Sequence, residues 1–226
     1  MASDILRKAV AEFIGTFALV FLGAGSIIAT GGTDLLLVAL AHGLTIAVMV
    51  SATAHISGGH FNPAVTLGAI VGRQMTVRVA LVYWIAQLLA ALVASAFLVA
   101  IFPAAAGPPV RLGTPAVAPS VSVLAAILVE AVLTFFLVIV VFGTGIDPKG
   151  AFHAVGGFAI GATIAVDIMM GGPLTGAAMN PARWFGPAVF ANAFDLWYVY
   201  WVGPFAGGVV AGLLYSRVLM ERAREA

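Results

Sequence analysis

Residues 178–186 read AMNPARWFG, and a related stretch at residues 60–68 reads HFNPAVTLG. Both place the triplet Asn-Pro-Ala between apolar runs, in a chain of which only 8% of the residues are charged. Proline fits the first position of a helix, because its φ is already helical and the N–H that it lacks would have no partner there. Asparagine directly before it is a preferred N-cap. Each triplet therefore predicts the start of a helix, at Pro63 and at Pro181.

The composition around these motifs is that of an integral membrane protein. Of the 226 residues, 62% are hydrophobic, and the mean hydropathy is +1.13, well above the values of soluble domains. A helix of about twenty apolar residues crosses the hydrocarbon core of a bilayer. The sequence therefore predicts one all-α membrane domain over residues 1–226, with six membrane-spanning helices at about 9–30, 35–54, 79–102, 121–142, 152–170 and 196–217.

The basic residues are distributed unequally between the two sides of the membrane. With six spans, both termini lie on one side. The loops and termini of that side contain eight of the ten Lys and Arg residues, namely Arg7, Lys8, Arg73, Arg78, Lys149, Arg217, Arg222 and Arg224. Cytoplasmic loops collect Lys and Arg. We therefore expect both termini to be cytoplasmic and the protein to lie in the plasma membrane, surrounded by lipid, with no nucleic-acid partner.

The two triplets belong to an internal repeat. Subtracting 62 from 180 gives an offset of 118, and the same offset relates many other positions. Examples are Glu12 with Glu130, Gly43 with Gly161, Ile46 with Ile164, and Gly68 with Gly186. The halves, approximately 1–110 and 111–226, each contain three spans, so the second half must cross the membrane in the opposite direction. Such inverted repeats place their functional site near the bilayer midplane.

Each triplet opens only about ten apolar residues, too few to cross the membrane. Non-helical backbone at membrane depth is tolerated where it is buried in protein or lines a water-filled cavity. We therefore expect two re-entrant half-helices whose N-termini meet beside a pore and repel cations with their positive helix dipoles. The amides of Asn62 and Asn180 can donate to the oxygen of a passing water molecule. That oxygen is then unable to accept a proton from its neighbour, which prevents proton transfer.

In their settings, SGGHFNPAVTLG and TGAAMNPARWFGP, the triplets resemble the aquaporin (major intrinsic protein) family, and the resemblance covers nearly the whole chain. It implies a passive water channel that excludes protons and ions, without cofactor or enzymatic activity, assembled as a homotetramer with one pore in each subunit. The family motif falls on Asn62, Pro63, Ala64, Asn180, Pro181 and Ala182.

The resemblance also implies a second, outer constriction, the selectivity filter, formed by His42, Ile168, Ala177 and Arg183. This set is similar to that of plant tonoplast intrinsic proteins, several of which pass ammonia and sometimes urea as well as water. Glu12 and Glu130 would accept hydrogen bonds from the re-entrant loops. The carbonyls that would line the pore are those of Gly58, Gly59, His60, Gly176, Ala177 and Ala178.

Other functions remain open at this stage. The stretch GPLTGAAMNPAR resembles glycerol facilitators, although Trp184 follows the arginine where those proteins carry aspartate. An alternating-access transporter is also built from inverted repeats and could use Glu12 and Glu130 for protons, and an adhesive membrane protein could contain an incidental pore. No nucleophile lies beside a base, so we expect no enzyme.

Several polar residues have other interpretations. His55 and His60 are expected to anchor the first loop, and no metal site is expected, since the chain has no cysteine and no carboxylate cluster near them. His153, at the cytoplasmic start of the fifth span, could gate the pore by protonation. Asp167 could face the outer vestibule or pair with Arg111.

Overall fold

The computed structural model describes residues 2–150 and 155–221, and in this part of the chain all regular structure is helical. Six helices are long and apolar enough to cross a membrane, which confirms the predicted fold class. The α-helices are α1 (Ala2–Thr30), α2 (Leu35–Ser57), α3 (Pro63–Val71), α4 (Val77–Ile101), α5 (Val123–Val141), α6 (Gly156–Thr175), α7 (Pro181–Ala191) and α8 (Val199–Leu214). His153, which was considered as a gate, lies outside the described residues, as do Phe152, Arg222 and Arg224.

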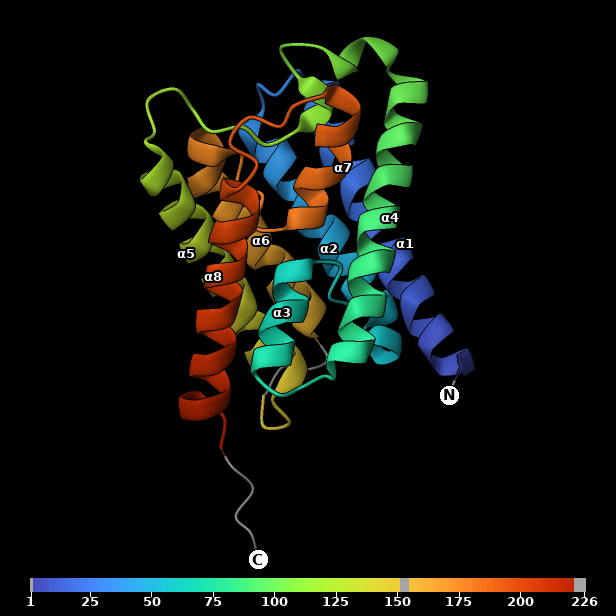
Figure 1. Ribbon diagram of the computed structural model, residues 1–226, viewed down its shortest axis with the longest axis vertical. Coiled ribbons are helices and arrows are strands. Elements are labelled where there is room, and N and C mark those ends of the chain that lie inside the picture. Colours follow the sequence, from blue (N-terminus) through green and yellow to red (C-terminus); the bar gives the residue numbers. More distant parts are fainter. Residues whose placement is uncertain (1, 151–154, 222–226) are drawn as a thin grey trace, which may run out of the picture.

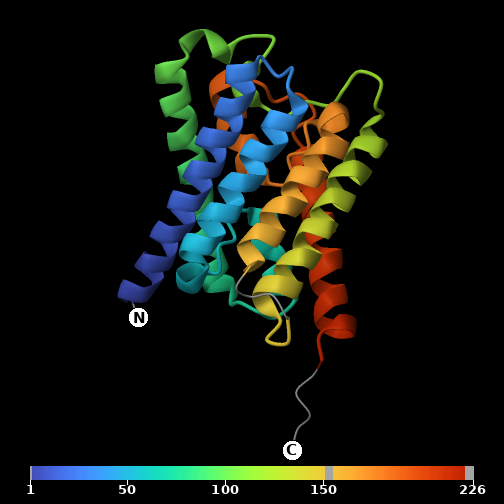
Figure 2. The ribbon, with the colours of Figure 1, turned by 180° about the vertical axis from the view of Figure 1, so that it is seen from behind.

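The two short helices occupy opposite halves of the bundle. Figure 1 shows α7 above α3 in the middle of the view, with the start of α1 and the end of α8 at the lower end of the molecule. Helix α3 packs against α8 and α4, and α7 packs against α4. From behind, α1, α2, α6 and α5 stand side by side in that order (Figure 2), and each contacts the next. The half-helices are therefore enclosed by spanning helices from both repeats.

The two repeats cross most closely where α2 meets α6. A Cβ atom added to Gly43 would lie 2.5 Å from the carbonyl oxygen of Gly161, and one added to Gly161 would lie 2.2 Å from that of Gly43. Small residues allow the backbones of membrane helices to approach in this way. These two glycines are repeat partners, so the crossing lies on the axis that relates the halves.

The fifth span differs from its prediction at its outer end. We expected it to stop near Met170, before Gly-Gly-Pro, but α6 continues to Thr175 with Pro173 inside its last turns. Helix packing explains the extension. Gly171 lies against Leu133 of α5, and Gly172 lies against Leu35 of α2. Close contacts on both sides hold the helix together across a segment with weak intrinsic helix propensity.

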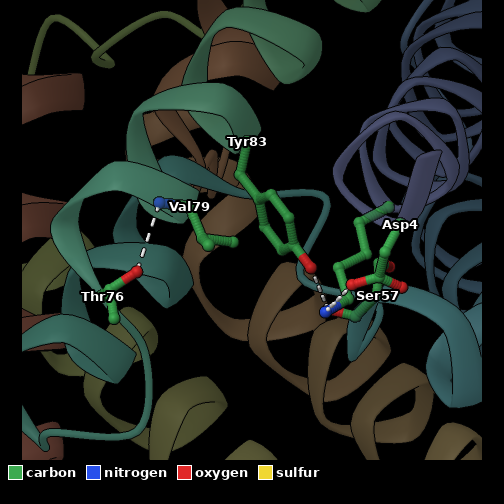
Figure 3. A network of polar contacts seen from close by, with 6 residues as sticks. Asp4, Ser57, Thr76, Val79 and Tyr83 are labelled. Atoms are coloured by element: carbon green, nitrogen blue, oxygen red, sulfur yellow. Dashed lines mark hydrogen bonds and ion pairs between the residues drawn. The ribbon is translucent and has the colours of Figure 1, made fainter. Parts of the chain in front are cut away.

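The predicted helix starts are shifted by a few residues. Helix α1 begins at Ala2 rather than Ala9, and its first turns contain an ion pair of 2.8 Å between Asp4 and Lys8. Helix α4 begins at Val77, because Thr76 acts as N-cap and accepts a hydrogen bond of 3.5 Å from the backbone N–H of Val79 (Figure 3). A side-chain cap, rather than the end of the apolar run, therefore sets the start of α4.

Candidate functional site

Each half-helix is capped by the asparagine that precedes it. The side-chain oxygen of Asn62 accepts a hydrogen bond of 2.8 Å from the N–H of Ala64. The oxygen of Asn180 accepts from the N–H groups of Ala182 and Arg183, at 3.0 and 3.2 Å. Proline follows at the first helical position in both cases. The caps satisfy N–H groups that would otherwise lack partners and fix both asparagine side chains at the helix ends.

The same two side chains tie the repeats together. The amide nitrogen of Asn62 donates to the carbonyl of Met179 at 2.9 Å, and that of Asn180 donates to the carbonyl of Phe61 at 2.8 Å. A side-chain amide has two N–H groups. One N–H of each asparagine is therefore used for the cross-link, and the second remains for a molecule beside it. This halves the donor capacity that the sequence alone suggested.

The two re-entrant loops have the same backbone conformation. The positions with positive φ in the first loop are repeated 118 residues later: Gly58, Gly59 and Phe61 in one half, and Gly176, Ala177 and Met179 in the other. Three of these residues have a Cβ atom, for which the left-handed region is unfavourable by about 1–2 kcal/mol each. Such a conformation persists only where surrounding contacts determine it.

Two buried carboxylates supply those contacts. Glu130 accepts hydrogen bonds from the Thr175 hydroxyl at 2.7 Å and from the N–H groups of Ala178 and Met179 at 2.9 and 2.7 Å. Both Glu12 and Glu130 are fully buried. A buried carboxylate is costly unless its oxygens are hydrogen-bonded, and here the loop N–H groups meet that need.

Glu12 makes the equivalent contacts in the first half and one more. It accepts from the Ser57 hydroxyl at 2.8 Å, from the N–H groups of His60 and Phe61 at 2.9 and 2.7 Å, and from the Gln87 amide at 2.8 Å. The geometry agrees with the structural role expected for these glutamates, because every one of these hydrogen bonds is donated by a re-entrant loop or by a side chain packed against it.

A tyrosine hydroxyl fixes the helix end before each loop. Tyr83 donates to the carbonyl of Ser57 at 2.6 Å (Figure 3), and Tyr200 donates to that of Thr175 at 2.9 Å. These carbonyls are in the last turns of α2 and α6, which have no further helical partner. The tyrosines were not among the residues singled out for this role from sequence.

A narrow cavity of about 30 Å³ runs between the two halves. A water molecule needs about 10–15 Å³ of such volume, so the cavity admits a short single file of molecules of that size. Of the predicted residues, it is lined by His42, Gly59, His60, Asn62, Ile168, Ala177, Ala178, Asn180 and Arg183. Gly58 instead lines the wider cavity described next, and Gly176 lies against Pro115.

The narrow cavity opens into a wider one of about 470 Å³ at the end of the bundle where α2 ends and α6 begins. His60, Val141 and Ile160 line both cavities, which therefore meet. His55 is on the wall of the wider cavity. Together they form a conduit from the midplane to the side predicted to be cytoplasmic.

The far end of the narrow cavity is marked by a buried arginine. Arg183 is 3% exposed, and its guanidinium donates to the carbonyl of Gly113 at 2.9 Å and to Nε2 of His42 at 3.2 Å. Nδ1 of His42 lies 2.8 Å from the carbonyl of Val38. Because a carbonyl only accepts, Nδ1 carries the proton and Nε2 accepts from the arginine. A fixed cation and a neutral imidazole thus lie together on the wall.

Comparison with known proteins identifies this arrangement. The sequence profile described as "Major intrinsic protein" matches residues 1–215. The chain belongs to the major intrinsic protein family. It is 42% identical to "Probable aquaporin TIP3-2" of Arabidopsis thaliana, over 98% of this chain and 87% of that protein, and 44% identical to "Aquaporin TIP4-4" of Zea mays, over 98% and 90%. The "X-ray structure of the aquaglyceroporin from Plasmodium falciparum" superimposes with a TM-score of 0.84 and 28% identity, covering 95% and 97% of the two chains.

Membership of the major intrinsic protein family agrees with the resemblance seen in the sequence and makes the chain a relative of channels rather than of enzymes. The apolar cavity wall, by contrast, was not predicted. It is formed by Leu19, Ile46, Val65, Leu137, Val141, Ile160 and Ile164. Four of these residues could have been found from the internal repeat, because Leu19 matches Leu137 and Ile46 matches Ile164 at the offset of 118.

The same offset shows where the major intrinsic protein pore departs from its symmetry. Arg183 corresponds to Val65, and His42 corresponds to Ile160. All four residues line the narrow cavity. The polar pair is therefore present at only one end, and its counterparts at the other end are apolar. Any polar contact that this pair makes with a passing molecule is therefore confined to one end of the cavity.

Asp167 does not pair with Arg111, one of the two places considered for it. Arg111 pairs instead with Asp195 at 3.3 Å, on the surface. Asp167 is 6% exposed, is absent from the walls of both cavities, and one of its oxygens lacks a hydrogen-bond partner among the described residues.

Proposed function

We propose that this protein is a passive channel that conducts water in single file and excludes protons and ions. The observation that carries the proposal is the narrow cavity lined by Asn62, Asn180 and Arg183 together. Its remaining wall is largely apolar, so a water molecule finds few polar partners and passes without being held. The similarity to proteins named aquaporins supports the same function.

Exclusion of ions follows from three positive features on one path. Two helix N-termini, each equivalent to about half an elementary charge, meet at the midplane, and the Arg183 guanidinium lies beside the cavity toward the outside. A cation passing through would lose most of its hydration shell in a cavity of about 30 Å³ without gaining a carboxylate partner. The free N–H groups of Asn62 and Asn180 orient each water oxygen toward themselves, which interrupts proton transfer along the file.

The selectivity filter of His42, Ile168, Ala177 and Arg183 sets the solute range in this proposal. Ile168 and Ala177 present an apolar and a small side chain to the lumen. Ammonia and urea are the further solutes that we propose, supported by the similarity to proteins named TIP. The alternative is a glycerol facilitator, supported by the likeness to a structure titled as an aquaglyceroporin.

The assembly and the membrane are further parts of the proposal. We propose a homotetramer with one pore in each subunit, since both half-helices come from one chain. The chain is a multi-pass membrane protein, with its termini in the cytoplasm as the distribution of basic residues indicates. The sequence led us to expect the plasma membrane, whereas the TIP-type relatives favour a vacuolar membrane. Fractionation of cells that express a tagged chain decides between them.

Stopped-flow light scattering on reconstituted vesicles tests the function. We expect water flux that is linear in the osmotic gradient and has a low activation energy, with no proton flux in the same vesicles when a pH-sensitive dye is enclosed. Parallel gradients of ammonia, urea and glycerol define the solute range. Flux that saturates with solute, or that is coupled to protons, indicates an alternating-access transporter and overturns the proposal.

A further inference from the structure

The ring of His42 packs against α1 at Gly23, which has no side chain. Leu19 of α1 lines the narrow cavity, and one helical turn further on is Gly23. A Cβ atom added to Gly23 would lie 2.5 Å from Nε2 of His42, 2.6 Å from Cδ2 and 3.0 Å from Cε1. Real Cβ atoms do not approach other atoms so closely, so the ring and any side chain at position 23 compete for the same volume.

The ring has little freedom to give way. Its Nδ1 is bound to the carbonyl of Val38 and its Nε2 to Arg183, and the side chain is 2% exposed. Protein interiors are packed densely, and a change of even one methyl group is transmitted to its neighbours. A side chain at position 23 therefore moves the ring away from α1, toward the cavity that it lines, and strains its bond with Arg183.

The second repeat shows where a side chain at the position equivalent to Gly23 lies when no histidine is opposite it. At the offset of 118, Gly23 corresponds to Val141 and His42 corresponds to Ile160. Val141 and Ile160 both line the narrow cavity, and Val141 also lines the wider one. A side chain at this position of the repeat therefore reaches the lumen. In the first repeat that place is taken by the edge of an imidazole.

We propose that Gly23 is a specificity-determining residue of the channel, because the absence of a side chain there sets how far the His42 ring withdraws from the lumen and aligns it with Arg183. The inference rests on the proposed channel function. Gly23 acts through His42 and is thus a positioning residue. A larger residue at position 23 narrows the selectivity filter without changing any of its four members.

The test compares alanine substitutions two residues apart on the same helix. Gly23→Ala meets the ring, whereas a Cβ atom on Gly25 would be 3.5 Å from Leu98, an ordinary contact. For Gly23→Ala we expect water permeability to fall about tenfold, equivalent to an added barrier of about 1.4 kcal/mol, and urea flux to fall at least as far. Gly25→Ala is expected to match the wild type in both fluxes.

A second background separates filter geometry from folding. In a His42→Ala chain the competing ring is gone, so adding Gly23→Ala should leave water and urea fluxes unchanged. Thermal unfolding in detergent shows whether each variant is folded. Wild-type vesicles without water flux would refute the proposed function itself. If the wild type conducts, equal fluxes in Gly23→Ala and Gly25→Ala overturn the inference alone. The inference also fails if Gly23→Ala reduces the fluxes by the same factor in the wild type and in the His42→Ala chain.

Discussion

The side-chain amide of Asn62 donates a hydrogen bond of 2.9 Å to the backbone carbonyl of Met179, 117 residues away along the chain. Asn180 makes the reciprocal bond to the carbonyl of Phe61. The residue that begins each half-helix therefore also holds the loop before the other half-helix. Neither loop can move without disturbing the opposite cap, so the two repeats position the midplane of the pore as a single unit.

Replacing Asn62 by alanine removes both the cap and this cross-link. The N–H of Ala64 and the carbonyl of Met179 would lose their partners in a buried site, and we expect a loss of about 2 kcal/mol in stability. Thermal unfolding in detergent measures it. Gln74, an exposed amide side chain outside both half-helices, provides a control, because an alanine there removes neither bond. Equal stability of Asn62→Ala and wild type would contradict this assignment.

Arg183→Val tests the proposed role of this arginine in the selectivity filter. Its removal takes the fixed charge from the wall of the cavity and frees the space beside Ala177 and His42. We expect urea and glycerol fluxes to rise and cations to leak, as stopped-flow and conductance measurements would detect. Arg78→Val is the matched control, since that arginine is exposed near the start of α4. An unchanged solute profile in Arg183→Val would exclude the arginine from the filter.

Glu12 and Glu130 differ in the number of hydrogen bonds that their carboxylates accept. Glutamine in place of either carboxylate keeps one acceptor oxygen and turns the other into a donor, which leaves N–H groups without partners at about 1–3 kcal/mol each. Glu12 accepts four hydrogen bonds and Glu130 three. We expect both variants to unfold at lower temperature and Glu12→Gln to be the less stable. The reverse order would be inconsistent with this count.

The close crossing of α2 and α6 predicts that the glycines differ in how far substitution by alanine lowers stability. In Gly161→Ala the new methyl group would meet the carbonyl of Gly43, and overpacking of this kind costs about 1–3 kcal/mol. A Cβ atom on Gly145 meets nothing within 4 Å, so Gly145→Ala should unfold at the wild-type temperature. Circular dichroism during heating compares the two, and similar behaviour would show that the crossing tolerates separation.

The chain contains no cysteine, so mercurial reagents that act on thiols should leave its water flux unchanged. Ala178 lines the narrow cavity, and Ala178→Cys places a thiol on that wall. We expect reversible block of this variant by a mercurial, relieved by a reducing agent, in the stopped-flow assay. Block of the unmodified protein, or no effect on the variant, would place the conducting path elsewhere.

The amino-acid sequence by itself determined the six spans, the inverted repeat and the starts of the two half-helices. Those features depend on local properties: the length of apolar runs, the fixed φ of proline and the capping preference of asparagine. One prediction from sequence was wrong: the fifth span was expected to end before Pro173, whereas α6 continues to Thr175. The prediction relied on local signals, which packing against α5 and α2 outweighs.

Only the tertiary structure decided how the asparagine amides are shared, which apolar residues form the cavity wall, and where Asp167 and Arg111 lie. It also showed the carbonyl of Gly113 on Arg183 and the vacancy at Gly23 that receives the His42 ring. These relationships join residues from different helices and loops. No propensity of one segment specifies them, because they exist only once the two halves have packed around their common axis.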